Sequence, residues 1–101
     1  MNTKSPQLIS SRIENVPKKP GVYILKSKQK IIYIGKSTRL RDRLKTYFLQ
    51  KKFKHQKEKN LNKYIDDFEY LVTETEQEAL LLENTLIKEY KPMFNIRLKD
   101  D

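Results

Sequence analysis

The sequence predicts one small α+β domain, in which helices flank a mainly antiparallel, three-stranded sheet. Three short runs rich in β-branched and aromatic residues, at 22–25, 31–34 and 68–73, have the composition of strands, and amphipathic helical patterns lie around them. A chain of 101 residues without internal repeats has room for a single modest core. We therefore expect residues 1–101 to form one domain, an α/β sandwich with helices packed on the sheet.

The first predicted elements are a short helix and a β-hairpin. Residues 6–16 have a helical pattern, and the prolines at 17 and 20 end it. Its aliphatic residues should face inward: Leu8, Ile9, Ile13 and Val16. The strands 22–25 and 31–34 flank a short polar segment, which is typical of a hairpin. That segment lacks an Asn-Gly pair, so the turn type stays open.

A helix is predicted to follow the second strand. Gly35 ends the strand, and Ser37 or Thr38 can cap a helix that continues to about Leu49. Three apolar residues at helical spacing form its expected buried stripe: Leu40, Leu44 and Phe48. Three others lie along an adjacent side: Arg39, Arg43 and Tyr47. The lysine-rich segment 51–64 then forms a helix or a loop before the third strand.

The last predicted helix carries a carboxylate where a hydrophobic residue is expected. A capping box at 75–78 begins this helix and Pro92 ends it, with Asn95 in a short extended tail. The apolar residues fall on one stripe: Ala79, Leu80, Leu82, Leu86, Ile87 and Tyr90. Glu83 projects into the middle of that stripe. A charge there is costly unless it pairs with Arg or Lys or holds a metal, and both explanations fit.

The positive charge is concentrated in one central block. Between residues 36 and 63 lie eleven Lys or Arg residues and two acids, and this block accounts for the whole net charge of +9. A solvated surface would explain a basic composition, but the concentration favours a polyanion such as nucleic acid. Without cysteine, and with His55 alone, disulfides and structural zinc are excluded, and we interpret His55 as a surface residue. No membrane-spanning run or signal peptide is visible, so we expect a cytoplasmic protein.

Several residues could carry chemistry near this block. Tyr23 and Tyr33 lie in neighbouring predicted strands and could share a face, although packing alone would explain them. Lys36 follows Gly35 directly and could meet a phosphate or lower the pKa of a tyrosine, but a Gly-Lys pair also suits an ordinary turn. Arg43 adds a planar donor suited to phosphate oxygens.

Two tripeptides, Gly21-Val22-Tyr23 and Tyr33-Ile34-Gly35, resemble the motifs that name the GIY-YIG endonuclease family. The longer segments 20–23, 32–37, 45–48, 78–88 and 90–101 resemble the UvrC branch, which shares valine in place of the isoleucine. The likeness covers about residues 17–101 and implies the GIY-YIG fold. Because full-length members of this branch continue into further domains, we expect the sequence to be an excised N-terminal nuclease domain.

The resemblance also implies a site and a function. Its metal-binding glutamate falls on Glu83, and its other catalytic positions fall on Tyr23, Tyr33, Lys36, Arg43, Tyr47 and Asn95. Its DNA contacts would come from Lys36, Arg39, Arg43 and Lys45. It implies a Mg²⁺-dependent endonuclease, with Mn²⁺ as an alternative, that cuts double-stranded DNA on the 3′ side of a lesion in nucleotide excision repair, within the SOS response. In the full-length context the partner would be the UvrB–DNA complex, and the isolated domain would be monomeric.

The chemistry of these side chains suggests a role for each of them in phosphodiester hydrolysis. One carboxylate suits a single hydrated Mg²⁺, and Arg43 would stabilise the charge on the phosphate. Tyr33 would be the base if Lys36, Arg43 and the metal lowered its pKa, with Tyr23 orienting the water, or these two roles could be exchanged. Asn95 would hold local structure. The competing interpretations are a DNA-binding module without activity and a free-standing GIY-YIG nuclease of the homing, restriction or junction-resolving type.

Overall fold

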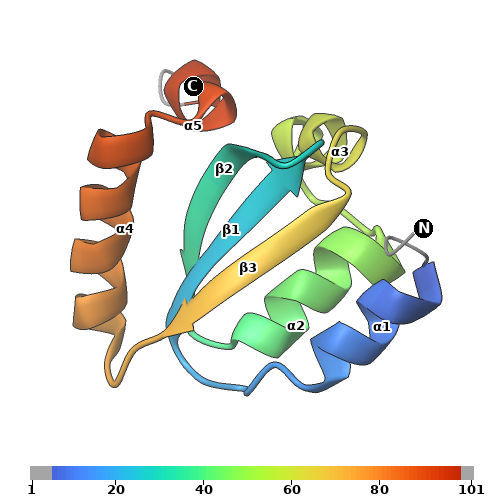
Figure 1. Cartoon of the computed structure of the whole chain (residues 1–101), viewed down its shortest axis with the longest axis horizontal. Coiled ribbons are helices and arrows are strands. Elements are labelled where there is room, and N and C mark those ends of the chain that lie inside the picture. Colours follow the sequence, from blue (N-terminus) through green and yellow to red (C-terminus); the bar gives the residue numbers. More distant parts are fainter. Residues whose placement is uncertain (1–5, 99–101) are drawn as a thin grey trace.

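A computed structural model describes residues 6–98. Residues 1–5, where no signal peptide was predicted, and residues 99–101, the last part of the family resemblance, lie outside the described residues. The elements in chain order are α1 (Pro6–Glu14), β1 (Gly21–Ser27), β2 (Lys30–Ser37), α2 (Leu40–Lys45), the π-helical turn η1 (Thr46–Gln50), α3 (Gln56–Asn62), β3 (Asp67–Val72), α4 (Glu76–Tyr90) and α5 (Met93–Leu98) (Figure 1).

The three strands form one antiparallel sheet in the order β2-β1-β3, which confirms the predicted α+β class. Tyr23 of the central strand lies opposite Gly35 of β2 and opposite Tyr70 of β3. The β1–β2 register shifts at Leu25, leaving Ile32 as an extra residue on β2. This bulge places Ile32 in the same core as Tyr23.

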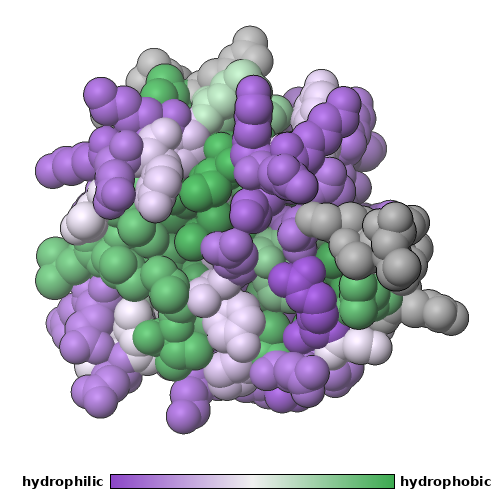
Figure 2. All heavy atoms as spheres, in the orientation of Figure 1, coloured by the Kyte–Doolittle hydropathy of each residue, from purple (hydrophilic) through white to green (hydrophobic). Residues whose placement is uncertain are grey.

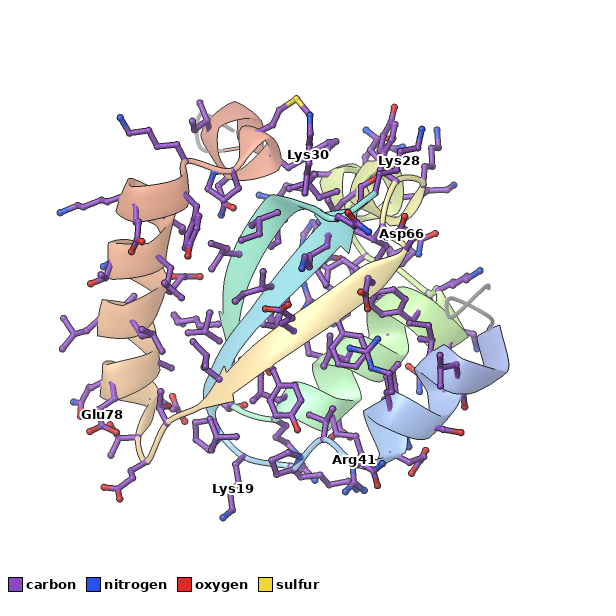
Figure 3. The ribbon with its side chains drawn as sticks, viewed as in Figure 1. Lys19, Lys28, Lys30, Arg41, Asp66 and Glu78 are labelled. Carbon is purple, nitrogen blue, oxygen red and sulfur yellow. The ribbon has the colours of Figure 1, made fainter. Side chains whose placement is uncertain are left out.

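The hairpin turn is held by a residue from a distant part of the chain. Lys28 and Gln29 both have positive φ, 51° and 72°, as a type I′ turn requires. Asp66 accepts a hydrogen bond from the backbone N–H of Lys28 at 2.9 Å, and Figure 3 shows the two residues at the same end of the sheet. The turn type that the sequence left open is therefore of the hairpin-favouring kind, without glycine.

Helices cover both faces of the sheet, and each face has its own core (Figure 1). The larger core lies between the sheet and the layer formed by α1, α2, η1 and α3, and it contains the aromatic rings of β1 and β3. The smaller core lies under α4, which packs on β1 and β2. Its buried members are aliphatic: Val22, Ile24, Ile34 and Ala79. The arrangement is the predicted sandwich.

Most of the predicted helix boundaries were right, but several residues predicted to face the core are exposed. Thr75 and Glu78 form the predicted capping box, and α4 ends before Pro92. Leu8, Leu80 and Tyr90, expected inside, are exposed. The segment after Pro92 is the helix α5 and not an extended tail.

Tyr47, and not Phe48, completes the buried stripe of α2. Tyr47 lies three residues after Leu44, on the same face, and all of its side chain is buried, whereas Phe48 is only partly buried. The helix changes here into η1, where the Lys51 N–H donates to the carbonyl of Thr46 at 2.8 Å. Single π turns are frequent at functional sites.

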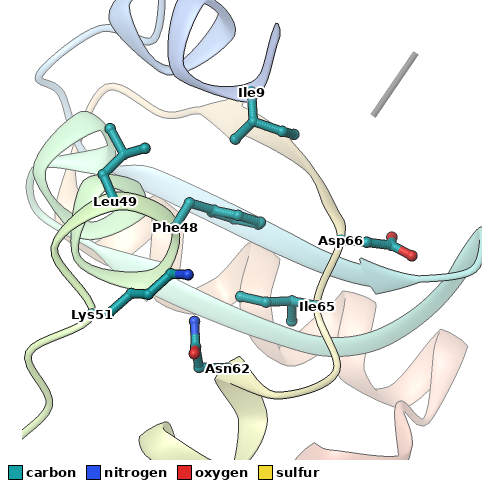
Figure 4. Close-up of a pocket in the computed structure, with 7 residues that line it drawn as sticks. All are labelled: Ile9, Phe48, Leu49, Lys51, Asn62, Ile65 and Asp66. Carbon is teal, nitrogen blue, oxygen red and sulfur yellow. The ribbon is translucent and has the colours of Figure 1, made fainter. Parts of the chain in front are cut away.

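Two surface features complete the fold. A cavity of about 270 Å³ lies between η1 and the segment before β3, lined mainly by apolar residues (Figure 4). Apolar side chains are also exposed over α4 and the adjoining sheet, among them Leu71, Leu80 and Leu81 (Figure 2). No helix within residues 6–98 is long and apolar enough to cross a membrane.

Candidate functional site

Tyr23 and Gly35 form the floor of the site. Any Cβ at Gly35 would collide with the ring and hydroxyl of Tyr23, so glycine leaves the space that the ring fills. Tyr33 lies diagonally across the strand pair, with its ring centroid 6.2 Å from that of Tyr23. Tyr47 approaches from the helical layer, with a centroid distance of 5.8 Å to Tyr23. The two motif tyrosines therefore share a face, as predicted.

Arg43 of α2 lies among these rings and is held by three acceptors. Its Nε donates to the Tyr23 hydroxyl at 3.3 Å, and its Nη2 donates to the Tyr47 hydroxyl at 3.2 Å. The same Nη2 donates to a carboxylate oxygen of Glu58 in an ion pair. Burial lowers the pKa of Arg43, but Tyr23, Glu58 and Tyr47 outweigh it and raise the pKa. The guanidinium is therefore charged, and its orientation is fixed.

Glu58 is the site residue that the sequence did not suggest. It is one of only two acids in the basic block, and both pair with arginines of α2 or its cap: Asp42 with Arg39, and Glu58 with Arg43. The sequence offered one indication, an acid that lies between two lysines, Lys57 and Lys59. A carboxylate in such a segment can become partly buried if it pairs with a cation that faces the core. Periodicity could not show which arginine it meets.

A cavity of about 290 Å³ opens beside Arg43. The residues that line it come from β2, α2, η1 and the region of α3: Tyr33, Arg43, Tyr47, His55, Lys57, Glu58 and Leu61. His55, interpreted from the sequence as a surface residue, is exposed but lies at this cavity. Basic and acidic groups thus converge with two phenols on one space large enough for a small polar group.

The outer edge of β2 is covered by side chains from the C-terminal helices. The Ile34 N–H donates to the Asn95 side-chain oxygen at 2.7 Å, and the Asn95 side-chain nitrogen donates to the Ile34 carbonyl at 2.8 Å. Asn95 thus satisfies both backbone groups as a neighbouring strand would. Its contacts agree with the structural role expected for it, although it lies in α5.

Glu83 lies on the side of α4 that faces the sheet, close to Lys36 of β2. Leu82, Leu86 and Ile87 pack on the sheet around it. Burial raises the pKa of Glu83, while a backbone hydrogen bond from Lys36 and the charge of Lys36 lower it, and the balance is a raised pKa. Among residues 6–98 no Arg or Lys forms an ion pair with Glu83, and the nearby charge of Lys36 does not offset the effect of burial.

Tyr33 and Tyr47 are neutral in this arrangement. Burial raises the pKa of Tyr33, electrostatic interactions with Tyr23 and Glu83 add to that effect, and Arg43 opposes it without cancelling it. Burial likewise raises the pKa of Tyr47. Arg43 alone therefore does not lower the pKa of Tyr33 below its usual value, because desolvation outweighs it, and the predicted lowering would depend on the added charge of a metal.

The remaining predicted DNA contacts lie around the cavity and not within it. Arg39 is largely exposed and pairs with Asp42 at 3.0 Å. Lys45 pairs with Glu14 of α1 at 3.2 Å. Lys36 is exposed at the end of β2, close to Glu83. The site thus gathers the predicted catalytic residues in two groups, the rings around Arg43 and the edge of β2.

No group of three or more His, Cys, Asp or Glu residues that could hold a metal occurs in the described part of the chain. A metal here would therefore depend on one carboxylate and on water. A half-buried carboxylate with hard oxygen atoms suits Mg²⁺, which keeps several waters and often binds through one or two carboxylates. Glu83 fits such an ion.

Residues 19–96 match the model of the UvrC-like GIY-YIG domain. The chain is 50% identical over 94 residues to UvrABC system protein C of Thermoanaerobacter sp., covering 92% of this chain but only 15% of that protein. It is 40% identical to the GIY-YIG N-terminal endonuclease domain of UvrC from Thermotoga maritima, solved with its catalytic cation magnesium, with a TM-score of 0.71 over 86% of this chain and 94% of that one.

A tyrosine-to-phenylalanine point mutant of the same Thermotoga maritima domain, also bound to its catalytic divalent cation, gives a TM-score of 0.72 at 40% identity, over 86% of this chain and 94% of that one. The chain spans about 15% of the length of the curated relatives it matches. The match of 78 consecutive positions, together with the antiparallel sheet and its two motif tyrosines, shows that the chain belongs to the UvrC-like GIY-YIG domain family.

Proposed function

We propose that this domain is a metal-dependent endonuclease of the UvrC type, which hydrolyses a DNA phosphodiester on the 3′ side of a lesion in nucleotide excision repair. One observation carries the proposal. A fixed guanidinium, Arg43, and a partly buried carboxylate, Glu83, come from the helical layers on opposite faces of the sheet, and the charges of both act on the same tyrosine, Tyr33. Phosphodiester hydrolysis needs both an anion-stabilising group and a cation-binding group in one site.

Glu83 would hold the cation, Mg²⁺ or alternatively Mn²⁺. A bound divalent cation would stabilise the charge that develops on the phosphate and on the leaving oxygen. The raised pKa of Glu83 indicates a carboxylate whose charge is poorly solvated, and a cation relieves that cost. The relative with a tyrosine replaced by phenylalanine still holds its catalytic cation, which agrees with a carboxylate as the ligand.

Arg43 would bind the non-bridging oxygens of the scissile phosphate. Its guanidinium is already oriented in the free protein, so little reorganisation is needed when the phosphate arrives. Lys36 would meet the phosphate from the end of β2. Arg39 and Lys45 would contact the DNA backbone beyond the cavity, where their contribution is affinity that weakens with salt.

Tyr33 would orient the attacking water and accept its proton. In the free protein the phenol is protonated and cannot act as a base at neutral pH, so this role depends on the charge of the bound cation. Tyr23 and Tyr47 accept hydrogen bonds from Arg43, which leaves their own hydroxyl protons to donate to the phosphate or to water. Because Tyr23 is buried beneath Gly35, it is the weaker candidate for the base.

Asn95 would support the site by fixing β2 between Tyr33 and Lys36. The isolated domain would act as a cytoplasmic monomer on double-stranded DNA, and within a longer protein on the UvrB–DNA complex. The same site on a free-standing nuclease is the second candidate. A module that only binds DNA is less well supported, because its binding surface would not require a partly buried carboxylate such as Glu83, which has no salt bridge among the described residues.

The direct test is to locate the cation. Crystals of the domain soaked in Mn²⁺ should show anomalous density within coordination distance of the Glu83 carboxylate, and supercoiled plasmid should be nicked only in the presence of a divalent cation. Density elsewhere, or nicking that survives a chelator, would contradict the proposal. A domain that binds DNA but never nicks it would favour the binding-module interpretation.

A further inference from the structure

We infer that Glu58 is a positioning residue that holds the Arg43 guanidinium in the orientation needed for catalysis. The inference rests on the proposed function, because it concerns the group that would bind the scissile phosphate. Glu58 lies in α3 and Arg43 in α2, so their ion pair joins the two helices across the cavity.

The hydrogen bonds of Arg43 show what Glu58 adds. A guanidinium has five N–H donors. Nε donates to Tyr23, and Nη2 donates to both Tyr47 and Glu58. Among the described residues no acceptor is assigned to Nη1, so its two donors remain for a substrate. The two phenol oxygens hold Nε and Nη2, and Glu58 adds a second acceptor at Nη2. This second acceptor restricts the rotation of the guanidinium group.

Burial distinguishes this ion pair from the other one in the basic block. The side chains of Arg43 and Glu58 are 30% and 16% exposed, whereas those of Arg39 and Asp42 are 61% and 47% exposed. Exposed pairs contribute little, since water screens them and both side chains stay mobile. The arginine side chain has several rotatable bonds, so a partly buried partner is an effective way to restrict it before the substrate binds.

A carboxylate beside a phosphate site also has a cost, and that cost gives a specific kinetic signature. Glu58 repels the incoming DNA phosphate, so its charge weakens substrate binding while its contact improves the geometry of Arg43. Replacing Glu58 by glutamine removes the charge and weakens the hold. Both kcat and KM should therefore fall, and the fall in kcat is the specific part, because removing a negative charge elsewhere in the basic block would lower KM alone.

The experiment compares Glu58→Gln with Asp42→Asn in the complete 101-residue chain. Both variants remove one negative charge from the same block, but Asp42 does not line the cavity. Nicking of supercoiled plasmid in Mg²⁺ is measured against plasmid concentration. We expect kcat to fall about tenfold in Glu58→Gln and to stay within about twofold of wild type in Asp42→Asn, with KM lower in both. Glu58→Asp should recover part of kcat.

Equal kcat values for the two variants, or a faster Glu58→Gln, would overturn the inference. A second readout does not depend on cleavage. The Nε–H resonance of Arg43, assigned by its loss in Arg43→Lys, should be sharp in wild type and Asp42→Asn and broadened in Glu58→Gln. An unchanged resonance would overturn the inference even if the wild-type domain nicks no DNA, a result that would separately reject the proposed function.

Discussion

The two faces of the sheet contribute opposite charges to the site. Under α1, α2, η1 and α3 the core is rich in aromatic rings and surrounds Arg43, while under α4 it is aliphatic and surrounds Glu83. Two such side chains in one layer would form an ion pair and neutralise each other. The sheet keeps them apart, and both reach Tyr33 on the edge strand β2. Because the sheet separates the two side chains, this small domain keeps a charged arginine and a carboxylate near one tyrosine without an ion pair between them.

The two charges are also held differently. Arg43 has three side-chain acceptors, so its charge is compensated and its direction is fixed. Glu83 has a backbone hydrogen bond and the nearby charge of Lys36, and its pKa stays raised. The aromatic face is therefore preorganised, whereas the α4 face carries a carboxylate whose charge is only partly compensated by Lys36. Changing one residue at a time on each face tests this difference.

The largest expected effect comes from Glu83→Gln on the α4 face. Glutamine keeps an acceptor for the Lys36 N–H but removes the charge that would bind the cation, so divalent-dependent nicking should be abolished. Thermal stability should equal or exceed that of wild type, because a poorly solvated charge is lost. Plasmid nicking and thermal melts measure the two outcomes, and nicking at the wild-type rate would remove Glu83 from the proposed metal site.

Arg43→Ala, on the aromatic face, should have the next largest effect. Loss of one preorganised charged donor at a reacting oxyanion typically costs about 10²–10³ in rate. DNA affinity should fall much less, because the surrounding lysines remain. Single-turnover nicking and fluorescence anisotropy separate the two quantities. A loss of affinity without a loss of rate would make Arg43 a simple phosphate anchor.

Gly35→Ala tests how tightly the floor of the aromatic face is packed. The new methyl group would meet the Tyr23 ring, and overpacking of this kind typically destabilises a protein by about 1–3 kcal/mol. Displacing Tyr23 should also slow nicking, since its hydroxyl orients Arg43. In the double variant with Tyr23→Phe, the stability losses measured by urea unfolding should not be additive. Additive losses would show that the two residues do not compete for space.

The smallest expected effect is a pH dependence confined to the α4 face. The folded-state pKa of Glu83 lies above its unfolded value, so the folded state binds more protons between the two values. Ionisation of Glu83 therefore lowers the stability of the fold as pH rises through this window. Mg²⁺ affinity should change in the opposite direction and weaken as pH falls, because protons compete for the carboxylate. Melting temperatures of wild type and Glu83→Gln should differ more at neutral than at acidic pH, and parallel curves would contradict this.

Local patterns in the sequence predicted most helices and strands, but they predicted fewer of the contacts within the site. The Thr75–Glu78 capping box and the β-hairpin depend on neighbouring residues, and both were predicted correctly. Glu83 stood out because a charge interrupted a helical apolar stripe, and the structure keeps it beside the sheet. These signals need no knowledge of tertiary contacts.

The features that the sequence did not reveal are those set by long-range contacts. Glu58 meets Arg43 only because α3 folds back over α2. Asn95 was expected in an extended tail, but its pairing with Ile34 lies in a short helix. The raised pKa of Tyr33 in the free protein is caused mainly by its burial, and the depth of that burial could not be predicted from the sequence.

The sheet order also has a consequence for when this site comes into being. The β1–β2 hairpin and α2 are close in sequence and bring Tyr23, Tyr33 and Arg43 together, whereas Glu83 and Asn95 follow the distant strand β3. Local contacts form faster than distant ones, and a chain emerging from the ribosome completes its N-terminal part first. We expect the growing chain to bring Arg43 and the two motif tyrosines together before Glu83 joins them. If the proposed roles hold, an incomplete chain would therefore bind a phosphate before it could bind a cation.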